Sequence, residues 1–268
     1  MISQSFHGAA GRIVAAVAVM ALAACASNSA NQDGIRNTDA ASRVRVAMAA
    51  EAAGQPDVAV SMFAAAASTA PDEPEVQARY AAALSRNGQA QEAEQVIARG
   101  LERRPRDPRM LLAMGQMRAR AGLAAEAIAA FDQVLAQAPR DVAALNGRGV
   151  ALDLLSRHGE AQQSYRAAQV VEPSHIASAN NLAFSLMLSG QAAEAVTILS
   201  SLHRRPGAPP RVATNLGIAQ AALGDTRGAQ ATLEGRVDEV DLGRIVTALG
   251  GAPDRSAPAA PQRVAEPR

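Results

Sequence analysis

Small residues recur every 34 positions along most of this chain of 268 residues. One ladder is alanine, and a second ladder, five residues earlier, is glycine with a single serine. A fixed period of this length is typical of helix-turn-helix units that bury their apolar faces only by stacking on one another. The chain is therefore predicted to be all-α. The ladders are Ala59, Ala93, Ala127, Ala161, Ala195 and Ala229, and Gly54, Gly88, Gly122, Ser156, Gly190 and Gly224.

Proline closes the first four units at the same interval, at Pro71, Pro105, Pro139 and Pro173. Because proline lacks a backbone donor and clashes with the preceding helical turn, the second helix of each unit is predicted to stop just before it. Glycine between the two helices tolerates a left-handed backbone. Ser156 interrupts that ladder while Gly159 lies nearby, so the fourth unit is predicted to turn differently.

The spacing within a unit identifies its type. In the third unit Gly115, Ala127, Phe131 and Pro139 are separated by 12, 4 and 8 residues, and the fourth unit repeats these intervals. This pattern resembles the tetratricopeptide repeat (TPR). The resemblance implies a superhelical solenoid of about six helix-turn-helix repeats in which the large residue of each unit fills the core. Phe63, Phe131 and Tyr165 are accordingly predicted to be core residues.

The predicted organisation has four parts. Residues 1–24 are read as a signal peptide, 25–39 as a flexible tether, 40–249 as the solenoid and 250–268 as a disordered tail. A C-terminal capping helix is predicted from Leu242, Ile245, Val246 and Leu249, which fall at helical spacing. The repeats are placed at about 40–73, 74–107, 108–141, 142–175, 176–209 and 210–243.

The amino terminus predicts a lipid anchor. Arg12 precedes an apolar run of about ten residues, which suits a signal peptide and is shorter than the roughly 20 residues of a bilayer span. The run ends in Leu22-Ala23-Ala24-Cys25, which resembles the bacterial lipobox, and Cys25 is the only cysteine. The resemblance implies cleavage before Cys25 and acylation of its thiol, for example with palmitate. The alternative is an ordinary signal peptide that leaves a free thiol.

The residues after the cysteine bear on localisation. In lipoproteins of this kind an Asp directly after the cysteine is a common signal for retention in the inner membrane, and here Ala26 and Ser27 follow. The similarity favours the periplasmic face of the outer membrane. Two or more acyl chains would hold the protein there without a spanning segment.

Sites for catalysis, metals or cofactors are not predicted. The four histidines are isolated, and none has the spacing of a zinc motif. Gly147-Arg148-Gly149 lies in a helix-forming segment and is interpreted as small-residue packing. The formal net charge is +1 and arginines are spread among acidic residues, which argues against nucleic acid. We therefore expect no enzyme activity, no cofactor, no metal and no small-molecule substrate.

Binding of a protein partner is the favoured role. The TPR resemblance implies that the first helices of the repeats line a groove. The first helix of the fifth repeat is apolar on this face and on its core face, which includes Leu182 and Leu186, and such excess apolar surface suggests a partner. The alternative is that a neighbouring helix or the tail covers it. The predicted groove residues are Asn146, Val150, Asp153, Leu154, Asn180, Phe184, Met187, Leu188 and Ile218.

The hypothesis is a groove for an amphipathic helix or an extended apolar peptide. Its anchors would be Phe184, Met187, Leu188 and Ile218. These side chains are large and apolar, as anchors of a binding interface commonly are.

A narrower resemblance lies in the last third of the chain. The linker Arg205-Pro206-Gly207-Ala208-Pro209-Pro210-Arg211-Val212, with Asn180-Asn181-Leu182 before it and Asn215-Leu216-Gly217 after it, resembles the TPR lipoproteins of the tight adherence (Tad), or Flp pilus, assembly system. This implies a non-catalytic scaffold that helps a pilus secretin to assemble. Another periplasmic envelope adaptor, for peptidoglycan hydrolase regulation or outer-membrane protein assembly, is the alternative. An enzyme or solute-binding protein is the third and least favoured class.

Overall fold

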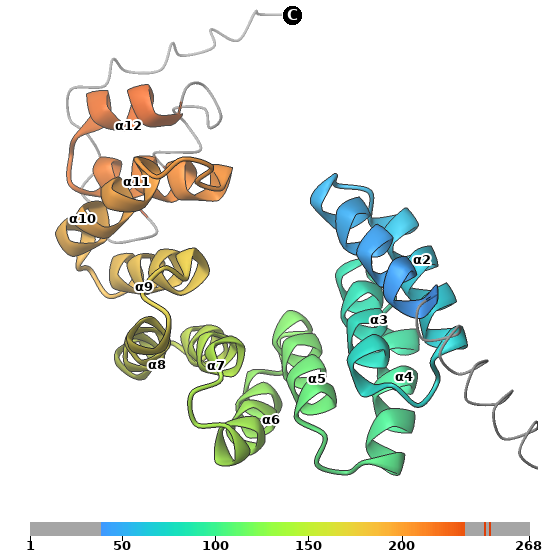
Figure 1. Cartoon of the computed structure of the whole chain (residues 1–268). Coiled ribbons are helices and arrows are strands. Elements are labelled where there is room, and N and C mark those ends of the chain that lie inside the picture. Colours follow the sequence, from blue (N-terminus) through green and yellow to red (C-terminus); the bar gives the residue numbers. More distant parts are fainter. Residues whose placement is uncertain (1–38, 234–243, 245–246, 248–268) are drawn as a thin grey trace, which may run out of the picture. The chain divides into compact units, whose positions relative to one another are not determined.

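The computed structural model describes residues 39–233 together with residues 244 and 247. Within these residues the regular elements are all helices, arranged as successive antiparallel pairs (Figure 1). The all-α TPR fold is confirmed. The signal peptide, nearly all of the tether, the tail and the four apolar positions of the capping helix lie outside the described residues.

Each repeat consists of a first and a second helix. The first helices are residues 39–52, α3 (Pro74–Arg86), α5 (Pro108–Arg120), α7 (Val142–Leu154), α9 (Ile176–Leu188) and α11 (Pro210–Ala222). The second helices are α2 (Pro56–Thr69), α4 (Ala90–Arg103), α6 (Ala124–Gln137), α8 (His158–Val171), α10 (Ala192–His203) and α12 (Thr226–Leu233).

The chain divides into two compact units, with the boundary inside α5, between Ala113 and Met114. In the described part of unit 1, α3 packs against both α2 and α4. In unit 2, consecutive helices from α6 to α12 pack on one another, and the first helices α7, α9 and α11 also contact their neighbours of the same kind. Each unit therefore has its own core.

The alanine ladder lies in the core of the repeats. All six alanines are at most 1% exposed, and Phe63, Phe131 and Tyr165 are equally buried, as predicted. Small residues on the first helices make room for the large ones. A methyl group added at Gly149 would lie 2.5 Å from the Tyr165 ring, and one at Gly115 would lie 2.7 Å from the Phe131 ring.

Gly147 also packs against Phe131, because an added methyl group would lie 2.5 Å from that ring. The interpretation of Gly147-Arg148-Gly149 as packing positions is confirmed. Gly217 has the same relation to Leu233, at 2.5 Å. In unit 2, therefore, a glycine on a first helix repeatedly faces a large side chain on a second helix.

The turns between paired helices use a left-handed residue. The ladder glycines have φ between +68° and +82°. Ser156 has φ +59°, so the prediction of a different turn in the fourth repeat is wrong. Its N–H donates to the Asp153 carbonyl at 2.9 Å, as the Gly122 N–H does to the Ala119 carbonyl at 3.1 Å. Gly159 lies in α8, where it makes no turn.

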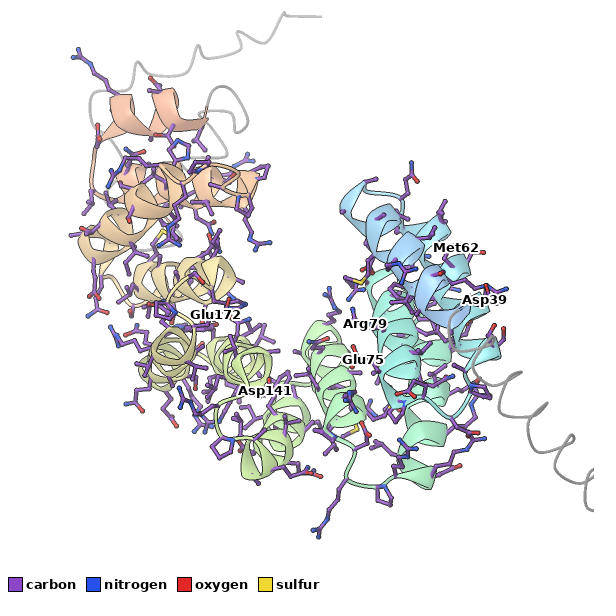
Figure 2. The ribbon with its side chains drawn as sticks, in the orientation of Figure 1. Asp39, Met62, Glu75, Arg79, Asp141 and Glu172 are labelled. Atoms are coloured by element: carbon purple, nitrogen blue, oxygen red, sulfur yellow. The ribbon has the colours of Figure 1, made fainter. Side chains whose placement is uncertain are left out.

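Nearby prolines and side-chain acceptors determine where several helices end or begin. The second helices α2, α4, α6 and α8 each end two residues before the ladder proline, as predicted. At the start of α7, the Asp141 carboxylate accepts a hydrogen bond from the Ala144 N–H at 2.8 Å (Figure 2). A side-chain acceptor here satisfies one of the backbone donors that a helix leaves free at its N-terminus.

Candidate functional site

The predicted groove residues lie on α7, α9 and α11 of unit 2. These first helices are neighbours, because α7 contacts α9 and α9 contacts α11. Positions 34 residues apart occupy equivalent places in a repeat fold, so Leu154 and Leu188 lie at matching ends of adjacent helices. The structure thus gathers the predicted residues in one region, and their burial decides which of them could contact a partner.

Three of the predicted apolar side chains are exposed. Leu154 is 52% exposed, Phe184 is 40% exposed and Leu188 is 36% exposed. We call these three residues the apolar face. The core side of the same helix, which includes Leu182 and Leu186, is buried as predicted. α9 therefore presents large apolar side chains to solvent that its core does not use.

The exposure of Val150, on α7, is intermediate. The side chain is partly buried and packs against the core of unit 2. It borders the apolar face without being one of its exposed members.

Two predicted anchors are not on the surface. Met187 is 2% exposed and Ile218 is 8% exposed, and both belong to the core of unit 2. The reason is that α9 contacts α7, α8, α10 and α11, so its buried arc is wider than the one face that the sequence pattern assigns to the core. Met187 and Ile218 are therefore corrected from groove anchors to core residues.

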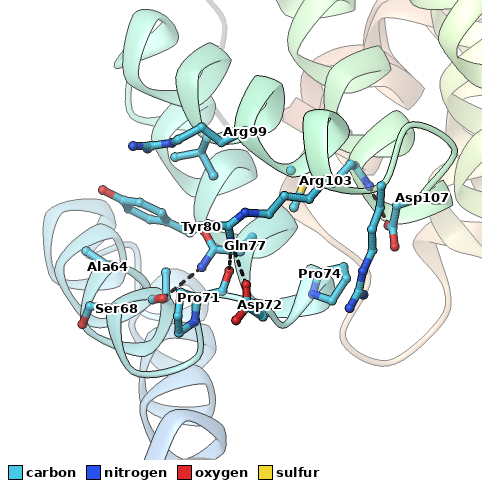
Figure 3. Close-up of a pocket in the computed structure, with 15 residues that line it drawn as sticks. Ala64, Ser68, Pro71, Asp72, Pro74, Gln77, Tyr80, Arg99, Arg103 and Asp107 are labelled. Carbon is cyan, nitrogen blue, oxygen red and sulfur yellow. Dashed lines mark hydrogen bonds and ion pairs between the residues drawn. The ribbon is translucent and has the colours of Figure 1, made fainter.

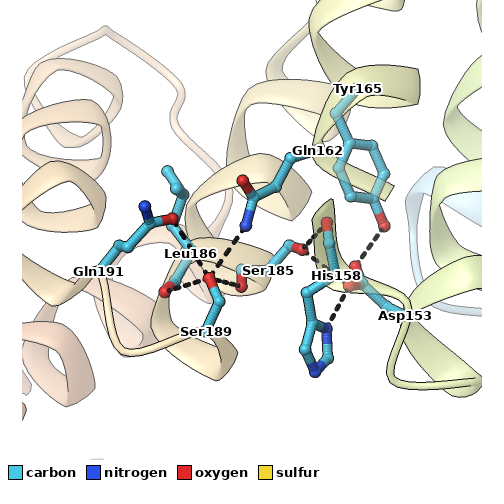
Figure 4. Close-up of polar contacts among 8 residues, drawn as sticks. All are labelled: Asp153, His158, Gln162, Tyr165, Ser185, Leu186, Ser189 and Gln191. Atoms are coloured by element: carbon cyan, nitrogen blue, oxygen red, sulfur yellow. Dashed lines mark hydrogen bonds and ion pairs between the residues drawn. The ribbon is translucent and has the colours of Figure 1, made fainter. Parts of the chain in front are cut away.

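Asp153 holds three helices together (Figure 4). Its Oδ2 accepts a hydrogen bond from the Tyr165 hydroxyl of α8 at 2.9 Å, and its Oδ1 accepts one from Ser185 Oγ of α9 at 2.7 Å. His158 Nδ1 lies 2.8 Å from the same Oδ1. Burial, and next the negative charge of Asp153, raise the pKa of Tyr165 above its ordinary range. Asp153 therefore serves the fold, because both of its carboxylate oxygens already accept hydrogen bonds from side chains of this protein.

Asn146 and Asn180 also link first helices. The Asn181 side-chain amide donates to Asn146 Oδ1 at 3.0 Å, and the Asn215 amide donates to Asn180 Oδ1 at 3.0 Å. Both bonds join residues 35 positions apart and connect α7 to α9 and α9 to α11. Asn180 is buried, so its amide serves the fold. The 35-residue spacing of these pairs is visible in the sequence and is a signal that the prediction did not use.

The described residues offer little chemistry beyond this. Among them, no group of three or more His, Cys, Asp or Glu side chains is placed to hold a metal ion. No helix in the described ranges combines the length and the apolar character needed to cross a membrane. Cys25 lies outside these ranges, so the lipid anchor stays a prediction from the sequence.

The helical repeats define a protein-interaction scaffold. Residues 50–117 match the family model of the tetratricopeptide repeat. Comparison with curated proteins gives no match. The region of the match includes α2, α3 and α4 and most of α5, whereas the apolar face lies beyond it.

Solved structures share the fold at low sequence identity. PilW, described as a widely conserved type IV pilus biogenesis factor, is 17% identical, with 78% of this chain and 97% of that chain covered and a TM-score of 0.61. PilF of Pseudomonas aeruginosa is 14% identical, with 80% and 99% covered and a TM-score of 0.59. A chain of the APC/C heterotetramer Cut9–Hcn1 is 14% identical, with 82% and 46% covered and a TM-score of 0.63. At these identities the likeness concerns the fold alone.

Proposed function

We propose that this chain is an outer-membrane lipoprotein that binds an apolar helix or peptide of a protein partner through α7 and α9, and that it resembles TadD in assisting the secretin of a Flp (Tad) pilus. The scaffold holds a partner segment in place and performs no chemistry. The lipid on Cys25 keeps it at the periplasmic face of the outer membrane.

The observation that carries the proposal is the exposure of the apolar face. Core packing accounts for Met187 and Ile218, but it does not account for Leu154, Phe184 and Leu188. Three large apolar side chains on adjacent helices match the way a helical scaffold receives the apolar side of an amphipathic segment. Aromatic and aliphatic anchors of this kind contribute most of the affinity in many interfaces.

The pilus context is supported by the shared fold of two solved structures and by the linker. PilW, described as a type IV pilus biogenesis factor, has this repeat fold, and so does PilF of Pseudomonas aeruginosa. The linker that resembles the Tad lipoproteins lies between α10 and α11, where Gly207 has φ +74° and Pro210 begins α11. Gly207 thus has the same left-handed backbone as the ladder glycines, although the linker joins two repeats and not the two helices of one repeat.

The partner is tested by co-purification of the secretin subunit with the full-length protein from cells that produce both. We expect the double variant Phe184→Asp, Leu188→Asp to lose at least nine-tenths of the recovered secretin, because each carboxylate would enter an apolar contact. Val170→Asp on α8 is the matched control, since Val170 is 80% exposed and lies on a second helix.

Circular dichroism accompanies this test, because both altered positions are exposed and helicity should not change. Equal recovery of the secretin with the double variant and the wild type would contradict the proposal. So would a loss of helicity in the double variant, since the face would then be structural. Recovery of a cell-wall hydrolase in place of the secretin would favour the other envelope role.

The lipid anchor has a separate test. Cys25→Ser is expected to abolish incorporation of a clickable palmitate analogue and to remove the protein from the outer-membrane fraction. Ala26→Asp should keep the label but shift the protein to the inner-membrane fraction. A Cys25→Ser protein that still carries label, or a wild-type protein without label, would overturn the anchor.

A further inference from the structure

The first turn of α9 is capped by a histidine. His175 lies just before α9, and its Nδ1 accepts a hydrogen bond from the Ser178 backbone N–H at 3.3 Å. At the equivalent positions before α5 and α7 the chain has Asp107 and Asp141. Asp107 accepts from two N–H groups in the first turn of α5, at 3.0 and 3.2 Å (Figure 3), and Asp141 accepts from the Ala144 N–H at 2.8 Å. The helix that carries Phe184 and Leu188 thus has an imidazole where α5 and α7 have a carboxylate.

This difference matters for the response to pH. The ordinary pKa of an aspartate is about 3.9, whereas that of a histidine is about 6.5 and lies close to neutral pH. A ring nitrogen accepts a hydrogen bond only while it carries no proton. The cap of α9 can therefore be lost in mild acid, where the caps of α5 and α7 remain.

The same ring nitrogen has a second contact. His175 Nδ1 lies 2.6 Å from Ser178 Oγ, and Ser178 Oγ lies 3.2 Å from Asn146 Oδ1 of α7. Ser178 is fully buried, and Asn146 Oδ1 also accepts from the Asn181 amide at 3.0 Å. Because a hydroxyl has a single proton, Ser178 can donate to His175 or to Asn146, but not to both.

The protonation of Nδ1 selects between two arrangements. Without a proton, Nδ1 accepts from the N–H and the hydroxyl of Ser178, and α9 is capped. With a proton, Nδ1 donates to Ser178 Oγ, the Ser178 hydroxyl donates to Asn146 Oδ1, and the Ser178 N–H loses its acceptor. The charged ring then also lies at the positive end of the helix dipole. Acid thus exchanges the cap of α9 for an additional link from α9 to α7.

Charged groups around His175 do not hold it in one form. First helices begin at the edge of the solenoid where second helices end, so the relevant side chains come from the beginnings of α7 and α11 and the ends of α8 and α10. Asp141 already accepts from the Ala144 N–H, and the others are exposed to solvent, which screens their charge. Within residues 39–233, the structure gives none of these side chains an ion pair with His175. The groups are Arg140, Asp141, Glu172, His203, Arg204, Arg205 and Arg211.

We propose that His175 is a pH-sensitive cap, which holds the first turn of α9 at neutral pH and in mild acid releases it, tying Ser178 to Asn146 instead. The device acts on the helix that carries two of the three residues of the apolar face. It is a property of this chain alone and does not depend on the proposed partner.

The test is amide hydrogen exchange of the full-length protein, followed by NMR at about pH 7.5 and about pH 5.5, on either side of the ordinary pKa of histidine. Rates are expressed relative to those of an unstructured peptide at the same pH. The Ser178 N–H lies in the first turn of α9, where the helix supplies no carbonyl acceptor, so its protection reports the cap. We expect this protection to fall at least tenfold in acid. Protection of the Met110 and Ala144 amides, which aspartates cap, should change by less than threefold.

Two variants assign the effect. His175→Asn keeps a side-chain acceptor that does not titrate, so the Ser178 amide should stay protected at both pH values, with a change of less than threefold. His203→Asn is the matched control, because His203 is an exposed histidine at the end of α10. This variant should keep the tenfold fall.

Three results would overturn the proposal. They are equal protection of the wild-type Ser178 amide at both pH values, an unchanged fall in His175→Asn, and loss of the fall in His203→Asn. Because exchange is measured without a partner, such a failure leaves the apolar face untouched. Failure to recover the secretin would likewise leave the cap untouched.

Discussion

At the scale of single residues, this fold depends on glycines at positions where a larger side chain would not fit. Gly149 faces the Tyr165 ring, and Gly115 and Gly147 both face Phe131. Each glycine lets a helix backbone approach a buried ring. Close-packed interiors tolerate little added volume, so these positions should be far more sensitive than glycines that face open space.

Gly149→Ala is expected to lower the free energy of unfolding by about 1–3 kcal/mol, because the new methyl group overlaps the Tyr165 ring. Urea unfolding followed by circular dichroism measures this. Gly159→Ala is the matched control, since nothing lies within 4 Å of an added Cβ there and alanine favours the helix by up to about 1 kcal/mol. Equal effects of the two variants would contradict the packing argument.

Ser156 is the one position in the turn ladder that carries a side chain at positive φ. Ser156→Gly should raise the free energy of unfolding by about 0.5–1 kcal/mol, because a left-handed backbone costs a non-glycine residue roughly 1–2 kcal/mol and glycine recovers only part of that. Gly122→Ser should have the opposite sign. If Ser156→Gly destabilised the protein in the same denaturation assay, the serine would have a role that its backbone does not explain.

At the scale of helices, polar side chains fix how α7, α8 and α9 meet. Asp153 of α7 receives hydrogen bonds from Tyr165 of α8 and Ser185 of α9, and Gln162 of α8 donates to Ser189 Oγ, just after α9, at 2.9 Å. Buried networks of this kind are costly when one partner is removed. They specify the register between consecutive repeats.

The raised pKa of Tyr165 predicts a pH dependence. The folded protein keeps the phenol proton at a pH where the unfolded chain, with a pKa of about 10, loses it. This contribution is complete below about pH 10, and the free energy of unfolding falls as the pH rises further, by up to about 1.4 kcal/mol per pH unit. Urea unfolding between about pH 8.5 and 11 measures the slope.

Tyr165→Phe provides the comparison for this slope. The variant should lose about 1–2 kcal/mol at neutral pH, because Asp153 loses a donor, and it should show a shallower decline above pH 10. An identical slope in the variant and the wild type would mean that Tyr165 is not the group that titrates.

At the scale of the whole molecule, the sequence predicted the repeats well because they depend on short-range patterns. Proline, ladder glycine and the buried alanines act within a single helix pair, so a fixed period reveals them. Ser156 was misjudged because a serine can take the same left-handed turn when the backbone hydrogen bonds of the turn are kept.

The candidate site was harder to predict, because exposure depends on neighbours. Phe184 and Met187 are both large apolar residues that the sequence pattern assigns to the groove. Only Phe184 is exposed, because the helices around α9 cover Met187. Asp153 and Asn180 were placed in a groove, but their side chains serve contacts with residues about one repeat away.

The central claim is that the apolar face is where a partner segment binds. The most direct measurement is photocrosslinking in cells, with a photoreactive amino acid at Phe184 of the full-length protein and, separately, at Val170. The account predicts that position 184 forms an adduct with the secretin subunit and that position 170, although more exposed, does not. Equal secretin adducts at both positions, or none at 184, would contradict it.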